Sequence, residues 1–420
     1  METKHDFEIL RYLVKQYLET ARQPEQDQRR NLWRRHNSLK MTRPPVLVML
    51  GFWNAWLRDY IPESSLRCSD PFFRGYERML RLKLFHATLG DDTIFEPWIS
   101  QGASHVLPSG GRWGIELSRT SPDVDGGAFA INPPLKELDD IHKLLKPRRQ
   151  IDEAQTAANL ARLRDAVGDL IEIDAVRGTA YAHFGGDIST DLIQLRGMEQ
   201  VMIDMYENPQ WLHGLLAFMR DGILAAQDKA EALGDFSLSC HDNQSMAYSE
   251  ELEDPHPNSG PRRRKQLWGF MAAQEFTLVS PQFHEEFLLR YQLPIIAKYG
   301  LSTYGCCEDL TNKIDMLRQI PNLRRIAVTP TADIGRCAEQ IGGSYVISWR
   351  PNPTDMVSAA FDEGRIRRII REGLSACRDN GCVVDITLKD IETVQGEPDR
   401  LSRWVRIVRE ETDGASQMPA

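Results

Sequence analysis

Residues 300–328 read GLSTYGCCEDLTNKIDMLRQIPNLRRIAV, and this stretch decides the fold class. The apolar and β-branched runs at 300–306 and 323–328 are typical of strands, and residues 310–319 between them have the apolar spacing of a helix. Two strands joined by a helix form a βαβ unit, in which the strands lie parallel. The stretch therefore predicts an α/β protein.

The same alternation continues on both sides of this unit. Helices are predicted at 283–297, 333–340, 365–379 and 399–409, with strands at 345–349 and 382–388. Earlier strands are predicted at 46–50, 93–95, 180–184 and 236–240, with a long helix at 208–233 that begins at Asn208-Pro209. About eight strands with helices between most of them predict a (β/α)8 TIM barrel.

The chain divides at the Pro44-Pro45 pair. Residues 1–43 form an expected N-terminal helical extension, in which a charged helix covers residues 7–35, and residues 44–420 form the expected barrel. Residues 102–134 are rich in Gly, Ser and Pro and predict a long excursion with its own hairpin. Residues 250–266 are a polar loop and a candidate mobile lid.

Composition excludes several classes of protein. The 420 residues are 41% hydrophobic and 26% charged, as in ordinary globular domains, and the net charge of −9 argues against a nucleic-acid binder. No apolar run is long enough for a membrane span, and the N-terminus lacks the apolar segment of a signal peptide. The seven cysteines follow no framework spacing. We expect a cytoplasmic protein with no disulfide.

In such barrels the catalytic groups lie on loops that follow the strands. Cys306 and Cys307 lie between a predicted strand and a predicted helix, where backbone N–H groups lower thiol pKa. The candidate catalytic residues are Cys306, Cys307, His241, Lys389 and Asp309. The candidate substrate-binding residues are Trp53, Asn54, Glu96, His183, Arg350 and Asn352.

The order of motifs resembles the uroporphyrinogen decarboxylase superfamily, which includes the zinc-dependent methyltransferases that serve corrinoid proteins. The likeness runs from about residue 178 to 409 and continues more weakly back to about residue 44. The segments that carry it are Gly178-Thr179-Ala180-Tyr181, Tyr206-Glu207-Asn208-Pro209, Val279-Ser280-Pro281, Tyr304-Gly305-Cys306-Cys307 and Trp349-Arg350-Pro351-Asn352-Pro353. The resemblance implies a (β/α)8 barrel, an enzyme of the methyltransferase or carboxy-lyase type, a corrinoid-carrying partner protein and zinc.

The sequence also departs from the family's patterns. The haem-pathway decarboxylases have an arginine-rich loop where residues 49–56 read MLGFWNAW, so a porphyrinogen with eight carboxylates is a poor fit. In the methyltransferases' zinc motif, Tyr304 replaces the histidine, Cys306 matches the first cysteine, and Lys389 stands about where the last cysteine would be. The candidate zinc ligands are Cys306, Cys307, His241 and Glu308.

Three functions stay open at this point. The first is a methyltransferase that works with a corrinoid protein or a thiol. The second is a metal-free decarboxylase of a small acid, in which Arg350 holds a carboxylate and Lys389 or Asp309 supplies a proton. The third is a barrel that binds a small molecule without catalysis.

Overall fold

The computed structural model of the protein describes residues 2–51, 53–120, 130–148 and 151–416. Its strands are β1 (Val46–Val48), β2 (Trp98–Gly102), β3 (Ser118–Thr120), β4 (Ala130–Asn132), β5 (Glu172–Val176), β6 (Trp268–Met271), β7 (Leu301–Tyr304), β8 (Leu323–Val328), β9 (Val346–Trp349) and β10 (Val383–Leu388). Within the described ranges, no helix is both long and apolar enough to cross a membrane.

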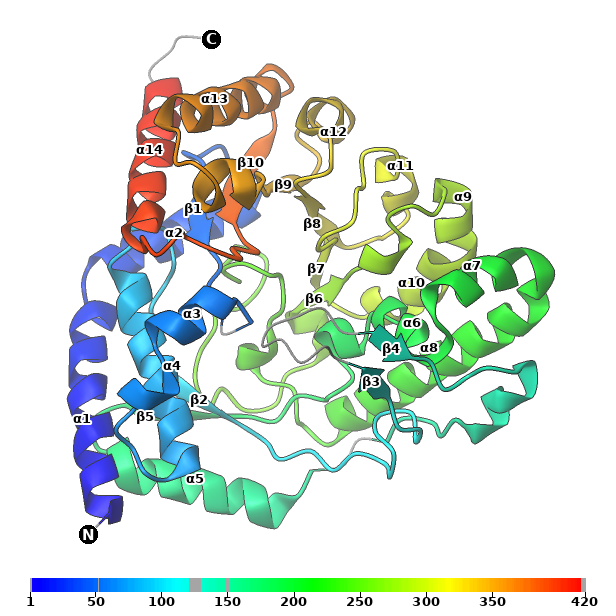
Figure 1. Ribbon diagram of the computed structural model, residues 1–420, viewed down its shortest axis with the longest axis horizontal. Helices are drawn as coiled ribbons and strands as arrows, with labels where there is room; N and C mark the ends of the chain where they lie inside the picture. The colour runs from blue at the N-terminus through cyan, green and yellow to red at the C-terminus, as the bar shows by residue number, and fades with distance from the viewer. Residues whose placement is uncertain (1, 52, 121–129, 149–150, 417–420) are drawn as a thin grey trace.

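Helices separate most of these strands. They are α1 (Glu2–Ala21), α2 (Glu25–Asn37), α3 (Ala55–Tyr60), α4 (Pro71–Ala87), α5 (Glu153–Val167), α6 (Ser189–Arg196), α7 (Met198–Glu207), α8 (Pro209–Ala232), α9 (Pro281–His284), α10 (Arg290–Ile296), α11 (Ile314–Leu317), α12 (Ile334–Ile341), α13 (Glu363–Asp379) and α14 (Asp399–Ser416). In Figure 1 helices α9 to α14 lie outside the arc of strands β6 to β10.

Six parallel strands form one sheet in the order β1-β10-β9-β8-β7-β6. Strands β8 and β10 are almost wholly buried, as expected of parallel strands that are covered on both faces, and β10 carries three valine or isoleucine residues. Strands β2 and β5 form a separate parallel pair. The α/β class is thus confirmed, and the order β6 to β10 followed by β1 is that of consecutive strands in a (β/α)8 barrel.

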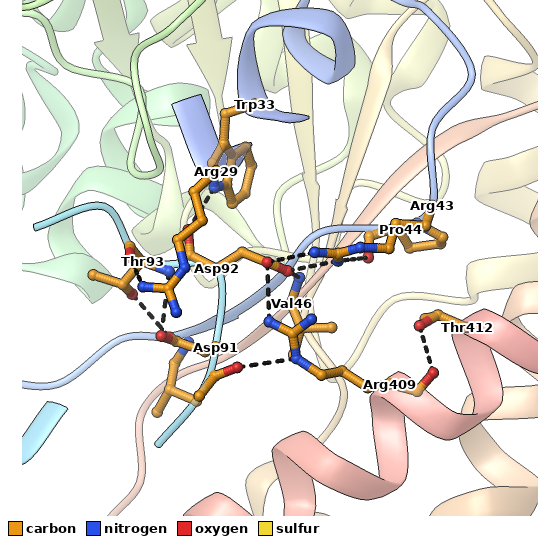
Figure 2. A network of polar contacts seen from close by, with 12 residues as sticks. Arg29, Trp33, Arg43, Pro44, Val46, Asp91, Asp92, Thr93, Arg409 and Thr412 are labelled. Carbon is orange, nitrogen blue, oxygen red and sulfur yellow. Dashed lines mark hydrogen bonds and ion pairs between the residues drawn. The ribbon is translucent and has the colours of Figure 1, made fainter. Parts of the chain in front are cut away.

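Closure of an eight-stranded barrel stays a prediction. Among the described residues, no backbone ladder joins β1 to β2 or β5 to β6. At the β1 edge, carboxylates take the place of a strand: Asp92 Oδ2 accepts from the Val46 N–H at 2.8 Å, and Asp91 Oδ2 accepts from the Val48 N–H at 2.8 Å. Figure 2 shows this network, in which Arg43 and Arg409 also bind Asp92.

Three of the early strand predictions were wrong in position. The second strand is β2 at 98–102 rather than 93–95, and the third is β5 at 172–176 rather than 180–184. Residues 238–240 form a 3₁₀ turn, because the Leu238 N–H donates to Ser259 Oγ at 3.0 Å instead of to a neighbouring strand. Strand β6 was not anticipated. The predicted hairpin in the excursion is present as the β3–β4 pair, and residues 121–129 between them lie outside the described residues.

The N-terminal helices pack onto the sheets. Helix α1 shares a buried apolar cluster with α4, α5, β2 and β5. At the end of α2, His36 Nε2 lies 3.0 Å from Asp385 Oδ2 of β10, and Asn37 Oδ1 accepts from Arg325 of β8 at 2.8 Å. Because both sheet residues lie in the first half of their strands, α2 covers the amino-terminal end of the sheet. The division at residue 43 stays a prediction. All seven cysteines are free, which confirms the absence of a disulfide.

Candidate active site

Gly305 directs the thiol of Cys306 into the mouth of the sheet. Side chains alternate along a strand, so Tyr304 and Cys306 are expected on one face. Gly305 has a φ of 101°, which breaks this alternation. The Tyr304 hydroxyl donates to Gln292 Oε1 at 2.8 Å and lies 2.8 Å from His284 Nε2, both on the covering helices. Cys306 instead packs in a separate cluster with Phe270, Ala272 and Phe184.

Glu308 holds the turn that carries both cysteines. Its Oε2 accepts from the N–H groups of Cys306 and Cys307 at 2.8 and 3.0 Å, and its Oε1 accepts from the Ala273 N–H at 2.7 Å. The carboxylate is fully buried. These backbone bonds occupy Glu308, so the sequence-predicted metal ligand is a structural residue of the turn.

Lys389 contacts both sulfurs. It follows β10, and its Nζ donates to Cys306 Sγ at 3.3 Å and to Cys307 Sγ at 3.4 Å. The neighbouring Asp390 carboxylate lies 3.1 Å from the same ammonium. Lys389 is 7% exposed and Cys306 is 4% exposed, so their attraction is little screened by water.

The two thiols are pushed toward different protonation states. The Cys307 thiol lies 3.5 Å from Cys306 Sγ, and as a donor it lowers the pKa of Cys306 to about 6, with further help from the charges of Lys389 and Arg350 and against the effect of burial. The pKa of Cys307 is raised, first by its hydrogen bond to Cys306 and then by burial. The arrangement therefore favours a thiolate at Cys306 and a thiol at Cys307.

A second cation, Arg350, lies at the end of β9. Its guanidinium donates to the Cys306 carbonyl and, at 3.0 Å, to Gln244 Oε1. The Gln244 amide in turn lies 3.8 Å from Cys306 Sγ. Arg350 is fully buried, and its Nε has no hydrogen-bond partner in the described part of the chain. Arg350 thus fixes the backbone at Cys306 and keeps one donor unused.

Three residues around this mouth have left-handed backbones. His183, Gln244 and Asp390 have φ values of 51°, 52° and 54°, which cost energy in any residue with a Cβ. The surrounding contacts must hold such conformations in place. The grouping of three left-handed residues around Cys306 is a structural sign of function, and no sequence pattern predicted it.

A cavity of about 410 Å³ adjoins the aromatic side of the mouth. His183 lines this cavity, and its Nδ1 lies 2.6 Å from Asp242 Oδ2, within hydrogen-bond distance. The His183 ring stacks on Phe270, with ring centres 4.7 Å apart. Phe270 also touches Cys306. The cavity and the thiol therefore share one aromatic wall.

Several candidate residues do not reach this mouth. His241 Nδ1 accepts from the Trp268 N–H at 3.1 Å and its Nε2 lies 3.1 Å from the Glu253 carbonyl, so the ring is a neutral structural histidine whose pKa burial lowers to about 4. Glu96 precedes β2 instead of following a strand, and it pairs with Arg30 of α2 at 2.7 Å. His241 lies beside the start of β6 and lines the cavity together with His183, and no hydrogen bond joins it to Cys306 among the described residues, so its catalytic role stays a prediction.

The remaining candidates occupy loops. Asp309 Oδ1 accepts from the N–H and hydroxyl of Thr311, and Asn352 Oδ1 accepts from the Thr354 N–H at 2.9 Å, so both cap turns. Trp53 is 61% exposed, and Asn54 is fully buried with neither side-chain polar atom bonded to a described residue. None of these four residues forms a hydrogen bond or ion pair with Cys306 in the described part of the chain, and their roles stay predictions.

The expected zinc ligands do not fit a metal as a set. Glu308 is bound to backbone N–H groups, His241 is bound elsewhere, and the Lys389 ammonium lies against both cysteine sulfurs. Within the described ranges, no group of three or more His, Cys, Asp or Glu side chains is arranged to hold a metal ion. The cysteine sulfurs are therefore paired with the Lys389 ammonium, a cation that the chain itself supplies.

The sequence did not single out Gln244, Phe184 and Phe270. Phe184 ends the strand predicted at 180–184 and Gln244 follows the strand predicted at 236–240, but neither was predicted as a site residue, and Phe270 lies in β6, for which no strand was predicted. A cluster of polar residues at 241–244 was the signal that pointed to this loop.

Comparisons with known proteins give little further information. No family model matches the chain, and no curated protein is similar to it in sequence. One solved structure with a related chain path is a methyltransferase from Methanosarcina mazei, which is 13% identical and matches over 92% of this chain and 98% of that chain, with a TM-score of 0.47. A likeness at this level carries no conclusion about activity.

Proposed function

We propose that the protein is a transferase that passes a methyl group through the sulfur of Cys306. One observation carries the proposal: the Lys389 ammonium touches the sulfurs of Cys306 and Cys307 inside a nearly buried mouth. A cation at this distance stabilises the thiolate, which is the nucleophilic form of cysteine. The sequence resemblance of residues 304–307 to the methyltransferase motif supports methyl over other groups.

The proposed step is a substitution at carbon. The Cys306 thiolate attacks the methyl carbon of a donor, the S–C bond forms, and the bond between the methyl group and the leaving atom breaks with both electrons on the leaving atom. A nucleophilic acceptor then attacks the same methyl carbon, the S–C bond breaks with both electrons on sulfur, and Cys306 leaves as the thiolate that Lys389 stabilises. Lys389 Nζ lies beside the sulfur and gives a proton to the leaving atom where that atom becomes anionic. Phe184, Phe270 and Ala272 form the apolar wall against which the methyl group rests.

The external partners follow from the resemblance. It implies a corrinoid protein that delivers or receives the methyl group, and this partner is part of the proposal. Zinc is the metal that the resemblance implies. Of the four residues expected to bind it, Glu308 and His241 hold other hydrogen bonds and Lys389 contacts both cysteine sulfurs, so the proposed step uses Lys389 and Arg350 to stabilise the thiolate.

The test uses methylcobalamin as methyl donor under anaerobic conditions, with mass spectrometry to locate the added methyl on the peptide that contains Cys306. We expect the label on Cys306 in the wild type and in Cys307→Ser, and none in Cys306→Ser. In Lys389→Met the labelling rate is expected to fall roughly 10- to 100-fold. Labelling at Cys307, or an unchanged rate in Lys389→Met, would contradict the proposal.

A second candidate is decarboxylation of a small carboxylic acid. It is favoured by the unpartnered Nε of the buried Arg350, which places a second cation beside Lys389. Release of CO₂ from short dicarboxylic acids by the wild type, and its loss in Arg350→Lys, would support this function. A binding barrel without catalysis would show neither methylation nor CO₂ release.

A further inference from the structure

A second cavity, of about 380 Å³, lies between helix α4 and strand β2. One face of α4 supplies Phe72, Gly75, Tyr76 and Lys83, and the segment leading into β2 supplies Glu96 and Trp98. Glu96 and Trp98 lie at the start of β2, whereas Cys306 follows the end of β7, and none of the described residues that line the cavity belongs to the mouth that holds the thiols. Its volume is in the range of small-molecule sites.

Lys83 brings an unsatisfied positive charge to this cavity. Within the described part of the chain, its Nζ has no hydrogen-bond acceptor. The ammonium lies over the Tyr17 ring, with 5.5 Å between Nζ and the ring centroid. Burial lowers the pKa of Lys83, and the charge of Glu96 opposes this effect. The half-buried ammonium is partly open to solvent and has no acceptor among the described residues, so an anionic ligand can bind it directly.

Glu96 does not neutralise Lys83 fully, because other groups hold its carboxylate. Arg30 Nη2 donates to Glu96 Oε2 at 2.7 Å, and the Tyr248 hydroxyl donates to Oε1 at 2.5 Å. Arg30 also pairs with Asp27 at 2.7 Å, so the charges of Asp27, Arg30, Glu96 and Lys83 balance as a group. Lys83 is the member of this group that has no carboxylate within ion-pair distance among the described residues, so its N–H donors are free for a ligand.

The walls of the cavity are flat and aromatic. The rings of Phe72, Tyr76 and Trp98 are half-buried, and the Tyr76 hydroxyl is fixed across the groove by a 2.6 Å bond to Gln101 Oε1. Gly75 opens the helix side, since a Cβ built there meets no heavy atom within 4 Å. Aromatic faces with one cation at the end suit a planar ring that carries an anionic group.

We propose that this cavity is a second binding site, which takes a planar aromatic carboxylate. The carboxylate accepts hydrogen bonds from Lys83 Nζ, and the ring lies between Tyr76 and Trp98. The site is independent of the thiol chemistry at the mouth.

The test measures binding of naphthalene-2-carboxylate and of its neutral analogue naphthalene-2-carboxamide by isothermal titration calorimetry. A charge-assisted hydrogen bond predicts that the wild type binds the carboxylate roughly 10- to 100-fold more tightly than the amide. In Lys83→Met the two probes are expected to bind equally. In Gly75→Leu the added side chain fills the cavity, and both probes are expected to lose binding.

Gly75→Ala is the matched control, because its single methyl group leaves most of the cavity open and binding should persist. Far-ultraviolet circular dichroism checks that each variant is folded. Equal affinity of the wild type for the two probes, no binding of either probe, or an unchanged preference in Lys83→Met would overturn the proposal. The Cys306→Ser variant should bind the carboxylate as the wild type does.

Discussion

At the scale of single residues, the thiol of Cys306 depends on its neighbours on three strand ends. Cys307 and Glu308 belong to its own turn, Arg350 follows β9, and Lys389 follows β10. These groups act on one sulfur from different directions. Its ionisation is therefore a property of the assembled mouth.

The pH dependence of Cys306 alkylation tests this ionisation. Because the pKa of Cys306 is lowered to about 6, first by the Cys307 donor and then by Lys389 and Arg350, its reaction with iodoacetamide should be half-maximal near pH 6. An ordinary cysteine reaches that point near pH 8.5. Mass spectrometry of the Cys306 peptide after short exposures at a series of pH values gives the midpoint.

Three variants separate the causes of this shift. Lys389→Met should move the midpoint upward, and Cys307→Ala should move it further than Cys307→Ser, which keeps a donor. Burial raises the pKa of Cys337 to about 11, so this cysteine serves as an internal unreactive reference. A wild-type midpoint near pH 8.5 would refute the predicted thiolate.

Gly305 is the second residue on which the mouth depends. With a φ of 101°, a Cβ at this position would lie 2.8 Å from Leu310 Cδ1 and 3.1 Å from Ala327 Cβ. Gly305→Ala should lower the free energy of unfolding by about 1–3 kcal/mol and should displace Cys306. Urea denaturation measures the first effect and iodoacetamide labelling the second.

Gly75→Ala is the comparison for Gly305→Ala. Gly75 lies in a helix with open space around its Cα, so alanine should raise the free energy of unfolding by up to about 1 kcal/mol. If both substitutions changed stability alike, the left-handed backbone at Gly305 would not be the cause.

At the scale of elements, the β1 edge and helix α14 are joined by one carboxylate. Asp92 is 1% exposed and accepts from the Val46 N–H, from both terminal nitrogens of Arg43, and from Arg409 of α14 at 3.0 Å (Figure 2). No described strand pairs with β1 on this side, but the Asp92 N–H donates to the Val46 carbonyl at 2.7 Å. The backbone and the carboxylate of Asp92 thus together bind Val46 where a strand neighbour is missing.

Asp92→Asn should therefore destabilise the fold strongly. The amide cannot accept from all these donors, and Arg43 and Arg409, whose side chains are 31% and 30% exposed, lose their carboxylate partner, at a cost of about 1–3 kcal/mol. Urea denaturation measures the loss. The control is Asp169→Asn, which removes an exposed pair with Arg11 and should change stability far less. Equal losses in the two variants would contradict the role of Asp92.

At the scale of the whole molecule, buried histidines make stability depend on pH. Burial lowers the pKa of His36, of His241 to about 4 and of His284 to about 3. In the unfolded chain these rings take up protons near pH 6.5, and in the folded protein they do not until lower pH. Their contribution to stability is full above pH 6.5 and is lost as the pH falls through the folded pKa values.

His284→Gln isolates one of these contributions. Asp187, whose pKa burial and Glu275 raise, opposes the histidines because it holds a proton only in the folded state. The slope of stability against pH between 6 and 4 should fall in the variant by about 1.4 kcal/mol per pH unit. Urea denaturation at several pH values checks this, and an unchanged slope would show that His284 is protonated in the folded protein.

The sequence by itself determined the fold class and the final strands. The strand runs at 323–328 and 382–388 became β8 and β10, because short apolar runs with β-branched residues between helices suit buried parallel strands even where single charged residues interrupt them. It also placed Cys306, Arg350 and Lys389 after strands, and those three residues do meet. These features depend on local pattern, which the sequence carries directly.

Only the tertiary structure decided which polar residues reach the mouth. Residues 236–240 have the composition of a strand, yet the Leu238 N–H donates to Ser259 and the segment ends in a turn. Strand β6 pairs with β7 in the sheet instead. Glu308 and His241 are residue types that bind metals, but each accepts a hydrogen bond from a backbone N–H far away in the sequence, Glu308 from Ala273 and His241 from Trp268. The positions of these side chains therefore depend on hydrogen-bond partners far away in the sequence, because most buried polar groups are paired in the folded protein.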